Sequence, residues 1–263
     1  MAPMASTTDA APDRRLDRST PPPPPPTDRR TLVEEILVVL ALSVLSGVAY
    51  AILSLLEAPV AGVVVASADR SNDLARQVLA FVFGLAPAFL VVHLVRRSGE
   101  GVAVVGLGAP RPAQDAGRGA ALFVVVGIAG IGLYLAAVEL GVNRFVLPAP
   151  PLGHWWTVPA LVLNALEAAV VEEVVVLGYL VTRLQQLSWS PPRAVAASAL
   201  LRGGYHLYQG WGGFVGNLAM GALFGWLFLR WGRRTWPFLV AHALLDIAAG
   251  IDFILFRDRL PGF

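Results

Sequence analysis

The sequence predicts an all-α fold, a polytopic transmembrane helical bundle of about seven spans. Of its 263 residues, 56% are hydrophobic and 14% are charged, whereas a soluble domain carries about 25% charged residues. Several apolar runs reach the roughly 20 residues that a helix needs to cross a bilayer. Turn-forming Gly and Pro residues separate these runs, as at residues 108–112 and 147–151.

Seven segments have the composition of membrane spans, and the fifth and sixth are shorter than the others. Glycines four residues apart in and just before the sixth segment predict that its backbone packs closely against a neighbouring helix. The seven segments are residues 36–56, 74–95, 120–140, 158–181, 194–209, 214–229 and 237–256, and the glycines are Gly212, Gly216, Gly221 and Gly225.

The chain divides into a tail and a membrane domain. Residues 1–31 are polar and Pro-rich, with a run of prolines at 21–26, so we expect a disordered cytoplasmic tail. The tail lacks the short apolar region and cleavage site of a signal peptide. Residues 32–263 are expected to form the membrane domain, whose first helix begins at Thr31 with Glu34 completing a capping box. Glu34 and Glu35 lie in that first turn, where the helix dipole favours carboxylates, so this pair is not a candidate site.

Charge and composition narrow the classes of partner. The chain has no Cys, which excludes disulfides, thiolate nucleophiles and thiolate metal sites. Its basic residues are all Arg, and with alternating spans 14 fall on one side and 5 on the other, with Arg202 inside a span. The richer side is expected to be cytoplasmic. We therefore predict a multi-pass protein of the cytoplasmic membrane with a cytoplasmic amino terminus, a lipid bilayer as partner and no nucleic-acid partner.

Ionisable side chains inside the predicted spans are the candidate functional residues. Glu172 and Glu173 lie in the fourth span, where a carboxylate at the bilayer centre costs roughly 2.5–3.5 kcal/mol. The fifth span contributes Arg202 and His206, and the seventh contributes His242 and Asp246, which are four residues apart and share a helix face. At about 1.5 Å per residue, Glu172, His206, His242 and Asp246 lie roughly 12–20 Å from the nearest cytoplasmic Arg, so all four approach the bilayer midplane.

This set can support peptide hydrolysis without a Ser or Cys nucleophile. A carboxylate that faces two imidazoles can deprotonate a water, or it can hold a divalent metal such as zinc that does so; the metal ligands would then be Glu172, His206 and His242. His242 and Asp246 can instead donate hydrogen bonds to a developing oxyanion. The alternative is that the polar groups only stabilise the fold. Three further ionisable residues are expected to be structural or interfacial: Glu167, His93 and His154.

Three motifs, in this order, resemble the CAAX-protease and bacteriocin-processing family, which includes the type II CAAX prenyl endopeptidases and the bacterial abortive-infection proteins. They are Glu-Glu at 172–173, the Arg-Gly-Gly-Tyr-His segment at 202–206, and the segment from Trp236 to Asp246; the resemblance covers about residues 158–249. It implies that Glu172 and His206 polarise the attacking water. It also implies that His242 and Asp246 line the oxyanion side or complete a metal site.

The chain departs from the family pattern at three positions. Leu177 stands where the first motif has Arg, and Arg202 stands where the second motif has Phe. A buried carboxylate needs a partner to stay charged, so we predict that Arg202 replaces the missing cation and pairs with Glu173. The last motif ends in Asp246 instead of Asn, and an acid there can donate only when it is protonated.

The sequence therefore predicts an intramembrane endopeptidase, of the metallo- or glutamate type, that acts on membrane-embedded or membrane-attached peptides and proteins. Two other classes remain open. One is a non-catalytic scaffold or bacteriocin-immunity-type member of the same family. The other is a proton-coupled carrier, although the chain shows no paired repeat of broken helices.

Overall fold

The computed structural model describes residues 28–57, 63–65, 74–143, 145–147 and 154–256. Most of the predicted tail, residues 1–27, lies outside these ranges, as do Arg70, Arg144, Arg257 and Arg259. The described residues are mainly helical, which confirms the predicted all-α fold.

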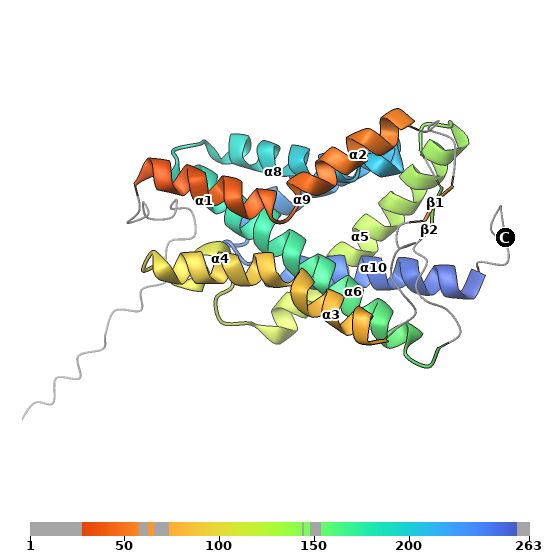
Figure 1. Ribbon diagram of the computed structural model, residues 1–263, viewed down its shortest axis with the longest axis horizontal. Coiled ribbons are helices and arrows are strands. Elements are labelled where there is room, and N and C mark those ends of the chain that lie inside the picture. Colours follow the sequence, from red (N-terminus) through yellow and green to blue (C-terminus); the bar gives the residue numbers. More distant parts are fainter. Residues whose placement is uncertain (1–27, 58–62, 66–73, 144, 148–153, 257–263) are drawn as a thin grey trace, which may run out of the picture.

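In Figure 1, α1, α2 and α8 lie along one side of the molecule and α3, α4 and α10 along the other, and α10 contacts both α5 and α6. In chain order the α-helices are α1 (Arg29–Ala41), α2 (Leu45–Glu57), α3 (Leu74–Gly84), α4 (Ala86–Arg97), α5 (Pro112–Glu139), α6 (Thr157–Glu172), α7 (Leu180–Gln186), α8 (Pro191–Tyr205), α9 (Trp211–Arg230) and α10 (Trp236–Phe256). The remaining elements are the 3-10 turns η1 (Val102–Val105) and η3 (Leu207–Gln209), the π-helix η2 (Glu173–Tyr179), and strands β1 (Val63–Val65) and β2 (Phe145–Leu147).

Each predicted span corresponds to helical structure, but some spans are divided. The first consists of α1 and α2, which meet at a 49° bend. The second contains α3 and α4, and the fourth contains α6, η2 and α7. In the part of the chain that the structure describes, four helices are long and apolar enough to cross a membrane, or five if the bent pair counts as one span. The predicted number of seven exceeds this because α6 ends where the π-helix begins and α8 has only 15 residues.

The first helix begins earlier than the sequence analysis predicted. Helix α1 begins at Arg29, and its N-cap is Asp28, whose carboxylate accepts hydrogen bonds from the backbone N–H groups of Arg30 and Thr31. The predicted cap, Thr31, instead donates its hydroxyl hydrogen to Asp28 at 2.6 Å. Asp is a strong N-cap residue, so the helix includes residues 29–31, which we had assigned to the tail.

Two short strands were not predicted. Strands β1 and β2 pair in parallel, with Val63 opposite Phe145, and they lie in the α2–α3 and α5–α6 connections. Because each has only three residues, the apolar pattern of the flanking helices conceals them.

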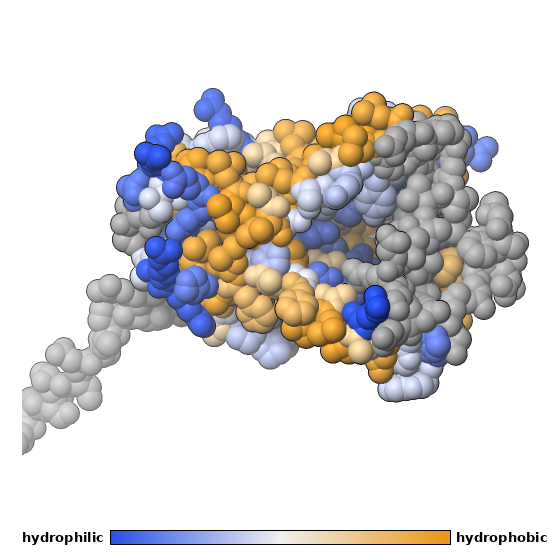
Figure 2. Space-filling view, viewed as in Figure 1, coloured by the Kyte–Doolittle hydropathy of each residue, from blue (hydrophilic) through white to orange (hydrophobic). Residues whose placement is uncertain are grey.

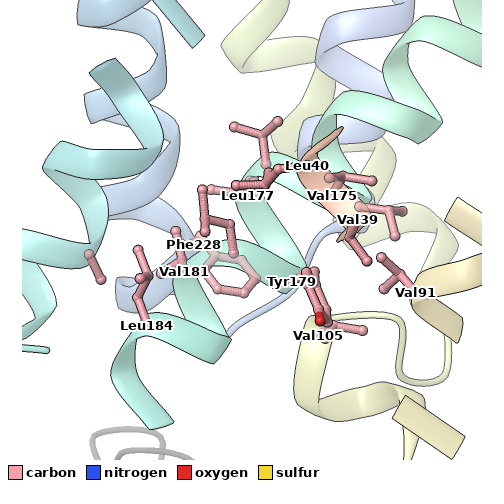
Figure 3. Close-up of a cluster of buried hydrophobic side chains, with 14 of the residues drawn as sticks. Val39, Leu40, Val91, Val105, Val175, Leu177, Tyr179, Val181, Leu184 and Phe228 are labelled. Atoms are coloured by element: carbon pink, nitrogen blue, oxygen red, sulfur yellow. The ribbon is translucent and has the colours of Figure 1, made fainter. Parts of the chain in front are cut away.

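The apolar core surrounds η2 and α7. Every residue of η2 is buried, and its valines pack against side chains of α1, α4, η1 and α9. Figure 3 shows Leu177 and Tyr179 among these neighbours. The segment that carries the two glutamates is therefore enclosed by the rest of the bundle, which fixes its position.

Helices α8 and α9 pack closely through the predicted glycines. A Cβ on Gly225 would lie 2.7 Å from Val195 Cγ1, and one on Gly221 would lie 3.0 Å from the Ala199 Cα. A side chain at either position would push the helices apart. This close approach places the carboxyl end of α8, which carries the second motif, against the bundle.

Candidate active site

The two glutamates lie at a change of helix type. Glu172 is the last residue of α6, and Glu173 is the first residue of the π-helix η2. A π-turn displaces backbone groups from the regular hydrogen-bond pattern, and such turns are frequent at functional sites. Here the Val176 carbonyl accepts a hydrogen bond from the buried Ser198 hydroxyl of α8 at 2.7 Å. The α8 helix therefore supports the π-turn directly.

One carboxylate oxygen of Glu173 contacts two buried side chains. Arg202 Nη2 of α8 lies 2.5 Å from Glu173 Oε1, and His242 Nδ1 of α10 lies 2.7 Å from the same atom. The Glu173 side chain is fully buried and that of Arg202 is 2% exposed. The predicted contact between Arg202 and Glu173 is present. Leu177 of η2 is packed in the apolar core and supplies no cation to Glu173.

Glu172 faces a different part of α8. Its Oε2 accepts a hydrogen bond from the Tyr205 hydroxyl at 2.7 Å and lies 3.8 Å from His206 Nε2. The Glu172 and His206 side chains are 16% and 17% exposed, whereas the His206 Nε2 atom itself is buried and has no hydrogen-bond partner among the described residues. This carboxylate and imidazole are therefore close enough to share one water molecule, with hydrogen bonds of about 2.8 Å to each.

Gln209 orients the His206 ring. The Gln209 amide nitrogen lies 3.2 Å from His206 Nδ1. When the amide donates to Nδ1, the neutral imidazole carries its hydrogen on Nε2, which faces Glu172. In this arrangement Nε2–H can donate to a water oxygen while Glu172 accepts a hydrogen from the same water.

His242 is placed differently from the sequence prediction. We expected it to face Glu172 together with His206, but its hydrogen bond is to Glu173. Successive residues of a helix project about 100° apart, so α10 meets the Glu173 side of the junction and the end of α8 meets the Glu172 side. The other nitrogen of the ring, Nε2, lies 3.5 Å from Asp246 Oδ2, and the Asp246 side chain is 42% exposed.

The residues do not fit a three-ligand zinc site. Catalytic zinc in proteins is commonly held by three side chains and a water, and no group of three His, Asp or Glu residues in the described ranges could hold a metal. Glu172 and His206 offer two donor atoms, whereas the ring of the third expected ligand, His242, lies between Glu173, 2.7 Å from its Nδ1, and Asp246, 3.5 Å from its Nε2.

Three other expected residues lie outside this cluster. His93 is exposed on α4, and His154 stacks on Trp156 before α6 with ring centroids 4.6 Å apart. Glu167 is half-buried on α6 and lines a separate cavity with residues of α3 and α4.

Tyr205 and Gln209 are site residues that the sequence analysis missed. Both flank His206, and both contact a candidate catalytic side chain. Neither residue type indicates chemistry by itself inside an apolar span. The only available signal was adjacency to His206, because polar neighbours of a buried imidazole commonly orient it.

One comparison with known proteins found a match. Residues 154–248 match the family model described as Type II CAAX prenyl endopeptidase Rce1-like. Neither the curated proteins nor the solved structures yielded a match. The matched residues run from just before α6 into α10, and they include both glutamates, Arg202 and the two histidines of the cluster. The segment from residue 154 to residue 248, which contains the candidate site, is therefore similar to the type II CAAX prenyl endopeptidase Rce1-like family.

Proposed function

We propose that this chain is an intramembrane endopeptidase that hydrolyses peptide bonds of membrane-associated substrates with a water molecule activated by Glu172 and His206. The observation that carries the proposal is the 3.8 Å separation of Glu172 Oε2 and His206 Nε2, two atoms of partly exposed side chains beside a buried ionic cluster, together with the lack of a hydrogen-bond partner at the buried Nε2 atom among the described residues. Protease chemistry at this level agrees with the family of the matched segment.

In this mechanism Glu172 is the general base. It accepts a proton from the water as the water oxygen attacks the carbonyl carbon of the substrate, and His206 Nε2–H holds the same oxygen in place. When the tetrahedral intermediate collapses, the C–N bond breaks and Glu172 returns the proton to the leaving amine. The Tyr205 hydrogen bond restricts the rotamers of Glu172 and so keeps the carboxylate oriented.

Glu173 and Arg202 position the site without touching the substrate. Their buried contact joins η2 to α8, and the contact from Glu173 to His242 joins η2 to α10. His242 and Asp246 are the donors we assign to the developing oxyanion, through the Nε2–H of a doubly protonated His242, whose Nδ1–H is donated to Glu173, or through a hydrogen on Asp246. Asp246 can serve in this role only in its protonated form.

We also propose that the end of the molecule that contains the start of α1 and the end of α4 is cytoplasmic. Figure 2 shows hydrophilic residues gathered at that end and a hydrophobic surface along the middle of the molecule. The two arginines in the last turn of α4, Arg96 and Arg97, lie there. This arrangement supports the orientation given by the arginine distribution.

The rival is a non-catalytic membrane scaffold, which the buried contact between Glu173 and Arg202 also favours. Glu172→Ala and His206→Ala distinguish the two. The purified variants are incubated in nanodiscs with a library of membrane peptides, cleavage is measured by mass spectrometry, and thermal unfolding is measured on the same samples. A protease loses cleavage and keeps its melting temperature.

The matched control is Glu139→Gln, which removes an exposed carboxylate at the end of α5. It should change neither cleavage nor melting. Loss of stability in Glu172→Ala and His206→Ala, with no cleavage by the wild-type protein, would favour the scaffold.

A further inference from the structure

The first turn of α9 is capped by a residue from a distant part of the chain. Its N-cap, Gly210, has a φ of 97°, a conformation that favours glycine. A glycine has no side chain that could accept a hydrogen bond from the first N–H groups of the helix. Asn143, which follows α5 and is 4% exposed, supplies the acceptor instead. Its Oδ1 lies 2.8 Å from the buried backbone nitrogen of Gly213, which donates to it.

Backbone contacts hold the same two segments together. Asn143 and Gly210 form an antiparallel bridge, and the Gly212 N–H donates to the Val142 carbonyl at 3.3 Å. Gly212 permits this approach, because a Cβ there would lie only 2.5 Å from the Ala137 Cβ of α5. The segment that follows α5 therefore fixes where α9 begins.

The Gln209 side chain packs directly on the residue that Asn143 caps. A Cβ on Gly213 would lie 2.4 Å from the Gln209 Cβ and 2.8 Å from its Oε1. The Gln209 amide nitrogen lies 3.2 Å from His206 Nδ1 and 3.1 Å from the Tyr208 hydroxyl oxygen, and these two contacts use both of its hydrogens. A displacement of Gly213 would therefore displace the amide group that faces His206.

We propose that Asn143 is a positioning residue for the candidate active site. By holding Gly213, it keeps the Gln209 amide on His206 Nδ1 and so selects the imidazole tautomer that carries its hydrogen on Nε2. A neutral imidazole has one N–H and one acceptor nitrogen, so a donor at one nitrogen places the hydrogen on the other. Because His206 Nε2 faces Glu172, this tautomer decides whether the nitrogen donates or accepts there.

This positioning comes from outside the matched family segment, since Asn143 precedes residues 154–248. Groups that orient a functional imidazole through its second nitrogen commonly affect activity about as strongly as ligands do. The use of the tautomer in cleavage rests on the proposed function, whereas the tautomer itself can be measured without cleavage.

The test reads the tautomer directly by NMR. Full-length protein that contains isotope-labelled histidine is reconstituted in nanodiscs, and the shifts of the ring nitrogens are recorded at a pH at which the imidazole is neutral. The chain has four His residues, and the His206 signals are assigned by their loss in His206→Gln. We expect the hydrogen on Nε2 in the wild type. We expect a mixture of both tautomers in Asn143→Leu, because Leu is similar in size and has no acceptor.

Two further variants separate positioning from folding. Asn143→Asp should keep the wild-type tautomer, because a carboxyl oxygen can accept from the Gly213 N–H and is favoured at a helix amino terminus. Gly213→Ala keeps Asn143 but should change the tautomer, since the added Cβ displaces Gln209. It supplies the same measurement if Asn143→Leu does not fold.

The matched control is Asn164→Leu, which removes a contact from α6 to Gln77 of α3. It should leave the His206 signals unchanged, whatever its effect on thermal unfolding of the same sample. In the cleavage assay, Asn143→Leu should lower kcat by about tenfold with little change in KM. Asn143→Asp should recover most of that loss.

An unchanged tautomer in folded Asn143→Leu or in Gly213→Ala would overturn the proposal. A wild-type ring that carries its hydrogen on Nδ1, or the same change in Asn143→Asp as in Asn143→Leu, would also overturn it. The expected change of tautomer with no cleavage by any sample would contradict only the proposed function.

Discussion

Tyr205 is the residue whose role is most easily separated from folding. Its hydroxyl donates to Glu172 at 2.7 Å, and removing it leaves the ring in place. A hydrogen bond to a charged group is worth about 1.5–3 kcal/mol, so Tyr205→Phe should lower kcat by about tenfold or more while KM changes little. The measurement is steady-state cleavage of a membrane peptide found in the library screen.

Tyr50→Phe is the control for this change, because Tyr50 is 73% exposed on α2. It should behave as the wild type does. An unchanged kcat in Tyr205→Phe would show that Glu172 does not need this donor.

Arg202 allows a test of the departure from the family pattern. Removing one partner of a buried ion pair costs about 3–5 kcal/mol, so Arg202→Ala should strongly destabilise the protein. A second change, Leu177→Arg, returns a cation to η2 four residues after Glu173 and should restore part of the loss. Thermal unfolding in detergent measures both effects.

Arg193→Ala serves as the matched control, because Arg193 is exposed in the first turn of α8. It should cost little stability. If Arg202→Ala unfolds at the wild-type temperature and cleaves normally, the compensation hypothesis is wrong.

At the scale of elements, the junction of α6 with the π-helix η2 is the feature that places both glutamates in the candidate site. In η2 the Val176 carbonyl depends on Ser198 of α8 for a hydrogen bond. Ser198→Ala leaves that buried carbonyl without its side-chain donor, at a cost of about 1–3 kcal/mol. We expect a lower melting temperature and, because the turn carries Glu173, a lower cleavage rate.

Ser190→Ala is the control, since Ser190 precedes α8 and its side chain makes no capping hydrogen bond. The two variants should differ clearly in melting temperature. Equal melting would mean that the Ser198 hydroxyl does not support the π-turn.

Residue patterns account for why some elements could be predicted and others could not. The positions of the helices follow from apolar runs, and the meeting of Glu172 with His206 follows from their matched depth in the bilayer. The π-helix had no signal, because residues 174–177 are all apolar and fit any helical period. The partner of His242 could not be predicted either, since Glu172 and Glu173 are adjacent and only the packing of α10 decides between them.

At the scale of the whole molecule, the orientation in the membrane can be tested with single cysteines. The chain has no Cys, so each introduced thiol is unique. Ser190→Cys lies at the start of α8, on the proposed cytoplasmic side, and Glu139→Cys lies at the opposite end of the bundle, at the end of α5.

A membrane-impermeant maleimide should label Glu139→Cys in intact cells and Ser190→Cys only in inverted vesicles. The physical reason is that arginine-rich ends stay on the cytoplasmic side during insertion. The reverse pattern of labelling would invert the orientation, although it would leave the geometry of the site unchanged.

The central claim is a division of roles between adjacent carboxylates: Glu172 acts on water, and Glu173 holds α8 and α10 in position. The most direct measurement compares Glu172→Gln with Glu173→Gln for peptide cleavage and thermal unfolding on the same preparations. Glu172→Gln should abolish cleavage at an unchanged melting temperature, and Glu173→Gln should melt several degrees lower, since a buried Arg loses its counter-charge. Cleavage that persists in Glu172→Gln, or melting that falls equally in both variants, would contradict the claim.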